Sequence, residues 1–217
     1  PNKNNIPLIE KILNQEIWEG EIQINGTKII NHPVKIMPGT NIVMAENANL
    51  IFKNHVHALG SSNSIINFSG ENSKSWGTIA LLGEGTNNSK FSHVTIEGGS
   101  GYEAPNIKFT GMFSLHDVKN ISLTNIEFKK NSLYDDLIHI VYSQNILLKN
   151  CVVSNALFDA IDIDISSIKI DNCKILFSGN DGIDSMSSEV KIQNSFINGS
   201  LDKGISVGEN SKVFVIK

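Results

Sequence analysis

Apolar and polar residues alternate in short segments along much of the chain, and the clearest of these segments recur at a nearly fixed spacing. NISLTNIEF starts at Asn120, NILLKNCVV at Asn145, SIKIDNCKI at Ser167 and EVKIQNSFI at Glu189. The sixth residue of each copy is an asparagine, at positions 125, 150, 172 and 194, so the repeat is 22 to 25 residues long. A partial copy, KVFVIK, starts at Lys212 and ends with the sequence.

Each copy contains three short stretches with a period of two, which is the pattern of a β-strand with one buried face. Three such strands in a short repeat, with no helical stretch between them, predict an all-β parallel β-helix and not a βαβ fold. Equivalent residues of successive coils would then stack about 4.8 Å apart. We expect the repeated asparagines to form an asparagine ladder, because Asn tolerates a left-handed turn and its amide can bond the next coil.

The place of this asparagine column, between the second and third strands of each coil, resembles that in the pectin-lyase-like right-handed parallel β-helices. The resemblance covers nearly the whole chain at the level of the repeat. It implies a right-handed solenoid, a polysaccharide groove on the first-strand face, and a bacterial protein that is extracellular or on the cell surface. DKGISVGE, residues 202–209, is also similar to segments of β-helix domains in uncharacterised secreted bacterial proteins.

We expect one β-helix domain over residues 1–217. Residues 1–32 would form an N-terminal cap and the first coil, with an amphipathic capping helix in PLIEKILNQ at 7–15. Residues 33–110 would form irregular coils and 111–217 regular ones. The sequence stops inside a coil at Lys217, so we expect further domains of the same polypeptide or a partner to cover that edge.

The composition narrows the possible partners. All 18 basic residues are lysines and the net charge is -4, so we expect no binding to nucleic acid. No apolar run of about 18 residues occurs, so we expect no membrane span. Cys151 and Cys173 fall in one inward column; we expect small buried residues there, although stacking would also permit a disulfide.

The acidic residues are concentrated in residues 159–209, and the repeat aligns most of them with the first strand of each coil. The leading residues, expected to point inward, are Phe113, Ile138, Ile161, Ile183 and Ile205. The next residues, expected to point outward, are Ser114, His139, Asp162, Asp184 and Ser206. A second outward column contains His116, Val141, Asp164, Met186 and Gly208. The turn before the strand contains Asp136, Asp159, Asp181 and Lys203, with Asp202 beside it.

Stacked carboxylates need a compensating interaction, since two of them about 5 Å apart repel by roughly 3 kcal/mol at an effective dielectric constant of 20. A hard cation such as Ca²⁺ could bind them. A shared proton could neutralise one of them. Alternatively, the side chains could spread into water while the turn aspartates cap backbone amides.

Two functions fit this pattern. The first is a polysaccharide-acting enzyme, namely a Ca²⁺-assisted uronate lyase, an epimerase or a hydrolase; a hydrolase of the inverting kind would place two carboxylates about 6.5–9.5 Å apart. The chain lacks arginine, the base of several β-helix lyases, so a lysine base is the remaining choice. The candidate catalytic residues are Lys203 as base, Asp184 and His139. The candidate substrate ligands are Asp164, His116 and Asp136. The candidate Ca²⁺ ligands are Asp159, Asp162, Asp181, Asp184, Asp202 and Glu209.

The second is a non-catalytic module that binds Ca²⁺ or a surface glycan at the same acids, or that serves as the stalk of a bacterial surface protein.

Overall fold

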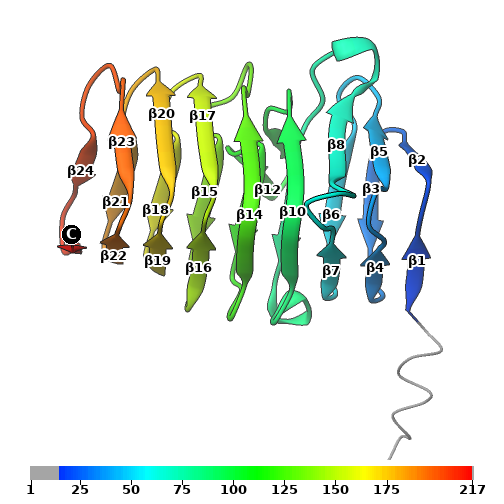
Figure 1. Cartoon of the computed structure of the whole chain (residues 1–217), viewed down its shortest axis with the longest axis horizontal. Coiled ribbons are helices and arrows are strands. Elements are labelled where there is room, and N and C mark those ends of the chain that lie inside the picture. The colour runs from blue at the N-terminus through cyan, green and yellow to red at the C-terminus, as the bar shows by residue number, and fades with distance from the viewer. Residues whose placement is uncertain (1–14, 217) are drawn as a thin grey trace, which may run out of the picture.

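The computed structural model describes residues 15–216, which wind into an all-β parallel solenoid of the right-handed type with about nine turns. The coils stack side by side along the long axis of the molecule (Figure 1). Nearly all strand pairs are parallel, and each joins a strand to its equivalent in the next coil. The predicted β-helix is therefore confirmed at this level.

Eight strands form a sheet that we call the first-strand sheet. They are β3 (Thr27–Ile30), β6 (Asn49–Phe52), β9 (Ile79–Leu82), β13 (Phe113–His116), β15 (Ile138–Val141), β18 (Ile161–Asp164), β21 (Ile183–Met186) and β24 (Ile205–Val207). This sheet carries the outward columns of acids and histidines that the repeat predicts.

The second and third strands of the coils belong to one 15-stranded sheet that folds around the core. Its main path is β1 (Glu16–Trp18), β4 (Val34–Ile36), β7 (Val56–Leu59), β10 (Lys90–Glu97), β14 (Ser122–Lys129), β16 (Ile146–Lys149), β19 (Ser167–Asp171), β22 (Glu189–Gln193) and β25 (Lys212–Ile216). The remaining strands are β2 (Glu21–Ile24), β5 (Asn41–Met44), β8 (Ile66–Gly70), β17 (Val152–Ala156), β20 (Lys174–Ser178) and β23 (Phe196–Asn198).

Three short elements interrupt the repeat in the N-terminal half. Two are 3₁₀ turns, η1 (Glu71–Ser73) and η2 (Glu84–Thr86). The third is an antiparallel hairpin of β11 (Tyr102–Ala104) and β12 (Ile107–Phe109). Among residues 15–216 there is no helix long and apolar enough to cross a membrane. The predicted helix at 7–15 lies almost wholly outside the described residues.

Inward apolar residues of successive coils form one continuous core. Phe113, Ile138, Ile161 and Ile183 pair in register and are fully buried, as the alignment predicts, whereas Ile205 near the C-terminal end is half-buried. Burying a side chain of this size contributes about 1.5–3 kcal/mol, so each column of the core stabilises several coils.

Polar columns fix the turns between coils. The side-chain amide of Asn150 donates to the side chain of Asn125 at 3.1 Å, and that of Asn172 donates to Asn150 at 2.9 Å. The amide of Asn194 instead donates to Asp171 at 3.2 Å. All four asparagines have positive φ angles of 52–55°, the left-handed conformation that Asn adopts more readily than most residues.

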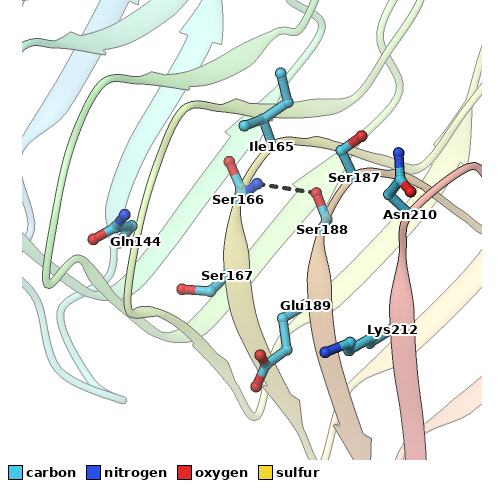
Figure 2. A pocket seen from close by; sticks show the side chains of 9 residues that line it. All are labelled: Gln144, Ile165, Ser166, Ser167, Ser187, Ser188, Glu189, Asn210 and Lys212. Carbon is cyan, nitrogen blue, oxygen red and sulfur yellow. Dashed lines mark hydrogen bonds between the residues drawn. The ribbon is translucent and has the colours of Figure 1, made fainter.

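Serine hydroxyls also form hydrogen bonds between successive coils, at another turn. The backbone N–H of Ser166 donates to the hydroxyl of Ser188 at 3.0 Å (Figure 2). That hydroxyl donates in turn to the carbonyl of Met186 at 2.8 Å. Ser166 accepts and donates in the equivalent way one coil earlier, and Ser143 does so two coils earlier. These bonds satisfy backbone groups where the ladder hydrogen bonds end.

Cys151 and Cys173 are both buried and free. The backbone N–H of Cys151 lies 3.4 Å from the sulfur of Cys173. The two residues therefore stack as small buried groups, as predicted, and no disulfide joins them.

Among the described residues, Ile165 is the one β-branched residue with a positive φ angle. It has a φ of 47° and is 47 % exposed, although a β-branched residue is strained in the left-handed region. We expect Ile165→Asn to raise the free energy of unfolding by about 1 kcal/mol, because Asn tolerates this conformation. The midpoint of urea unfolding measures the change.

Ile29→Asn is the matched control, since Ile29 is similarly exposed at 49 % but lies inside strand β3. This control should be neutral or destabilising. An Ile165→Asn midpoint at or below that of the unchanged protein would show that the turn is not strained.

Candidate functional site

Strand pairing brings the predicted outward residues into neighbouring positions. His139 on β15 pairs with Asp162 on β18, and Asp162 pairs with Asp184 on β21. In the second column Val141 lies between His116 and Asp164. The alignment made from the repeat is thus confirmed residue by residue across these strands.

Six side chains at this place form what we call the His139 cluster. Its members are Thr110, His116, Asp136, His139, Asp162 and Asp164. Asp136 lies two residues before the start of β15, and Thr110 directly follows β12 of the hairpin. The other four members project from β13, β15 and β18.

His139 is the centre of the cluster. Its Nδ1 lies 2.9 Å from the hydroxyl of Thr110, which donates to Asp136 at 2.6 Å, and 3.3 Å from Nε2 of His116. With Asp136 ionised, Thr110 donates to it and Nδ1 of His139 donates to Thr110; with Asp136 protonated, the carboxyl can donate to Thr110 and Thr110 to Nδ1.

The other nitrogen of His139 faces two carboxylates. Its Nε2 lies 3.6 Å from Oδ2 of Asp164 and 3.8 Å from Oδ2 of Asp162. The side chains of Asp162 and Asp164 are 23 % and 24 % exposed, so they reach the solvent beside a histidine that is 9 % exposed. The cluster therefore has an accessible acidic rim and a buried interior.

Burial dominates the charge state of the interior. It raises the pKa of Asp136 to about 8, with a further rise from Asp162 and partial compensation by Thr110 and His139. Burial also lowers the pKa of His116 to about 3, helped by the charge of His139. At neutral pH Asp136 thus keeps its proton and His116 is a neutral imidazole.

The acidic rim is tuned in a different way. Burial raises the pKa of Asp162 to about 7; His139 opposes this rise, and the neighbouring carboxylates of Asp164 and Asp184 add to it. Burial opposes protonation of His139, but its contact with the carboxylate of Asp164 and the charge of Asp162 leave its pKa raised overall. The Asp162 carboxyl is therefore partly protonated near neutral pH.

The hairpin determines where this face is open. Phe109 of β12 packs with Ile51 and Ala80 on the outer side of β6 and β9, and these three form a small core of their own. The ring of Phe109 also meets that of His116 edge to face, at 4.8 Å between centroids. The hairpin thus covers the outer side of β6 and β9 beside the cluster, whereas Asp162 and Asp164 on β18 remain partly exposed.

The segment that connects the hairpin to the cluster is closely packed against β15. A Cβ atom added at Gly111 would lie 2.8 Å from the backbone nitrogen of His139, closer than any side chain permits. Gly111 therefore lets the Thr110 segment cross beside β15, which places the Thr110 hydroxyl between Asp136 and His139.

The turn acids behave as backbone caps. Asp159 accepts the N–H of Asp181 at 2.7 Å and the amide of Asn180 at 2.9 Å. Asp181 accepts the N–H of Lys203 at 2.8 Å. Asp159 and Asp181 thus cap backbone amides, which is one of the alternatives that the sequence left open for stacked acids. Asp136 instead bonds Thr110.

Lys203 does not have the properties expected of a base. Its ammonium group contacts Asp202 and lies 3.9 Å from Asp181, and its side chain is 55 % exposed. The contact with Asp202 is the main reason why its pKa is raised, whereas a general base at neutral pH needs a lowered one. Lys203 is therefore a poor candidate for the base.

The predicted Ca²⁺ ligands do not converge on one point. Within residues 15–216, two groups place three ligand atoms within 4.8 Å of one another: Asp136, His139 and Asp162 in one, and Asp135, Asp136 and Asp159 in the other. Neither group includes Asp181, Asp184, Asp202 or Glu209. Asp184 accepts the N–H of Ser185 at 2.8 Å, and Asp202 and Glu209 are exposed.

The sequence did not reveal Thr110 of the His139 cluster or Asp135 of the second ligand group. Both lie in insertions between repeats, where the alignment of coils gives no position. The one available signal is the Thr-Gly pair at 110–111 directly before a strand.

Comparisons with known proteins add little to this description. No family model and no curated protein matches the chain. Among solved structures, a trypsin-treated variant of QnrB1, a plasmid-mediated fluoroquinolone resistance protein, is similar over 89 % of this chain and 91 % of that one, at 12 % identity and a TM-score of 0.29. The fold and the site are therefore defined by this chain's own strand pairing: a parallel β-solenoid with an acid–histidine cluster on one face.

The buried acid Asp136 gives the site a pH signature. Its folded pKa is raised to about 8, above about 3.9 for an unfolded aspartate. Its contribution to stability is therefore complete below about pH 4 and is lost as the pH rises to about 8. We expect Asp136→Asn, which mimics the protonated form, to flatten the fall in the urea midpoint between pH 5 and 9.

Asp117→Asn is the control, because Asp117 is exposed on the next turn. It should leave the pH profile unchanged. A wild-type profile that rises toward pH 9, or one that Asp136→Asn does not flatten, would show that Asp136 is ionised in the folded protein.

Proposed function

We propose that this chain is a polysaccharide-acting β-helix protein of the pectin-lyase-like kind, extracellular or on the cell surface, and that the His139 cluster is its active site. The observation that carries the proposal is the position of the cluster on the part of the first-strand sheet that the hairpin leaves uncovered. There it combines a buried, protonated aspartate with carboxylates that reach the solvent. Perturbed titratable groups of this sort concentrate at active sites.

The residues suit proton transfer to or from a sugar ring. Asp162 is accessible and has a pKa of about 7, so it is the proposed general acid or base. His139 stabilises its carboxylate, and Asp136 orients His139 through Thr110. Asp164 and Asp184 extend the acidic rim and are the proposed substrate contacts. Proton transfer of this kind is common to lyases, epimerases and hydrolases, and the role expected of Lys203 passes to Asp162.

The second candidate is a module that binds a divalent cation, with or without a glycan. The two groups of converging ligand atoms favour it. Asp135, Asp136 and Asp159 offer oxygen ligands alone, which suits Ca²⁺. Asp136, His139 and Asp162 combine oxygen and nitrogen, a set that transition metals accept more readily than Ca²⁺ does.

Activity on uronate polysaccharides tests the first candidate. With polygalacturonate, alginate and a glucuronan as substrates, we expect unsaturated products absorbing in the ultraviolet, or new reducing ends. Asp162→Asn should lower kcat/KM by about 10²–10⁴-fold, the usual contribution of general acid–base catalysis. Lys203→Ala should have little effect.

Asp117→Asn again serves as the matched acid-to-amide control and should keep full activity. If Asp162→Asn retains activity while Lys203→Ala loses it, the base assignment is wrong. If no substrate is turned over or bound, the polysaccharide proposal fails.

Thermal unfolding with EDTA and with added Ca²⁺, Mn²⁺ or Zn²⁺ tests the second candidate. A cation bound at 100 times its Kd would stabilise the fold by about 2.7 kcal/mol. Loss of the shift in Asp135→Asn would assign the ion to the all-oxygen group, and its loss in Asp162→Asn to the group with His139. No shift with any of the three ions would exclude this candidate.

A further inference from the structure

A polar cavity lies where the turns of three coils meet, at the ends of β8, β10 and β14. Its volume is about 520 Å³, within the range of about 300–1,000 Å³ for small-molecule sites. The loop between β14 and β15 supplies Lys130 and Ser132 to this cavity, whereas the far end of the same loop supplies Asp136 to the His139 cluster.

Contacts within the protein hold part of the wall of this cavity in place. The hydroxyls of Ser75 and Ser132, which belong to different coils, lie 2.6 Å apart, and the ammonium of Lys74 lies 2.7 Å from a carboxylate oxygen of Glu46. A Cβ atom added at Gly70 would lie 1.9 Å from the carbonyl oxygen of Lys74, so the turn there is tightly closed. A preformed wall lowers the entropic cost of binding.

Four polar groups on these walls have no partner within the protein. The hydroxyls of Ser69 and Ser73, the carboxylate of Glu97 and the ammonium of Lys130 line the cavity. Within residues 15–216, none of these four side-chain groups makes a hydrogen bond or ion pair. They are therefore available to a ligand.

The charges on the walls indicate which ligand chemistry fits. Glu97 and Lys130 balance each other, and Lys74 is already paired with Glu46. An anion would therefore meet Glu97, and a cation would meet Lys130. A neutral hydroxyl group suits both, since it donates to a carboxylate and accepts from an ammonium.

We infer that this cavity binds a neutral, polyhydroxylated sugar residue, with neighbouring sugar hydroxyls held by Glu97 and Lys130 and by the free serines. This binding site is separate from the His139 cluster and does not depend on the activity proposed for that cluster. It would let the protein hold a neutral part of a glycan on a face other than the acidic one.

Amide NMR titration with D-galactose, D-glucose and D-mannose, each to on the order of 10 mM, tests the inference. At least one sugar should shift the signals of Gly70 and Gly98 in a saturable way. Glu97→Gln and Lys130→Gln should each weaken that binding about tenfold or more, as expected for a lost hydrogen bond to a charged group. Lys35→Gln, an exposed lysine on β4, is the control and should bind normally.

The same titration with D-galacturonate tests the charge argument. If galacturonate binds more tightly than every neutral sugar, the cavity is an anion site and the assignment is wrong. Equally, no saturable shift with the three neutral sugars, or unchanged binding in both variants, would overturn it. Both substitutions are at exposed positions, and unchanged thermal unfolding would confirm that each variant is folded.

Discussion

The structure depends on the register in which each coil pairs with the next. Parallel strands about 4.8 Å apart place equivalent residues directly above one another, and the pairs Ile138–Ile161 and Ile161–Ile183 show this along the core. The constraint favours apolar side chains inside, and asparagine and serine at the turns, where each bonds the next coil. It also forces acids of successive coils together wherever the repeat supplies them.

The acids are accommodated by different interactions at different positions. Asp159 and Asp181 accept backbone N–H groups from the following coil, so stacking there provides hydrogen bonds. Asp162 lies between His139 and Asp184, so the histidine on one side offsets the repulsion from the carboxylate on the other. Asp136 is buried and retains its proton. An acid column can therefore cap backbone groups in one part and have perturbed pKa values in another, and the contacts of each residue decide which.

The sequence alone predicted what the repeat controls. Alternation and the asparagine spacing were sufficient to align His139 with Asp162 and Asp184, because register is set by which face is buried. Thr110 and the hairpin lie in an insertion that no repeat places, so the donor to Asp136 and the cover over Ile51 could not be anticipated. The raised pKa of Lys203 could not be anticipated either, because the contact with its neighbour Asp202 depends on side-chain conformation. Sequence reasoning thus located the face of the site, whereas the three-dimensional contacts identify which of its acids are unusual.

The central claim is that burial keeps Asp136 protonated at neutral pH while Asp162 titrates near it. Carbon-detected NMR of the aspartate carboxyl groups, followed from pH 3 to 10, measures both values directly. We expect the Asp136 signal to titrate near 8 and the Asp162 signal near 7, against about 3.9 for an ordinary aspartate. If both signals titrate near 4, the cluster is an ordinary solvated group of acids, and the account of the site is contradicted.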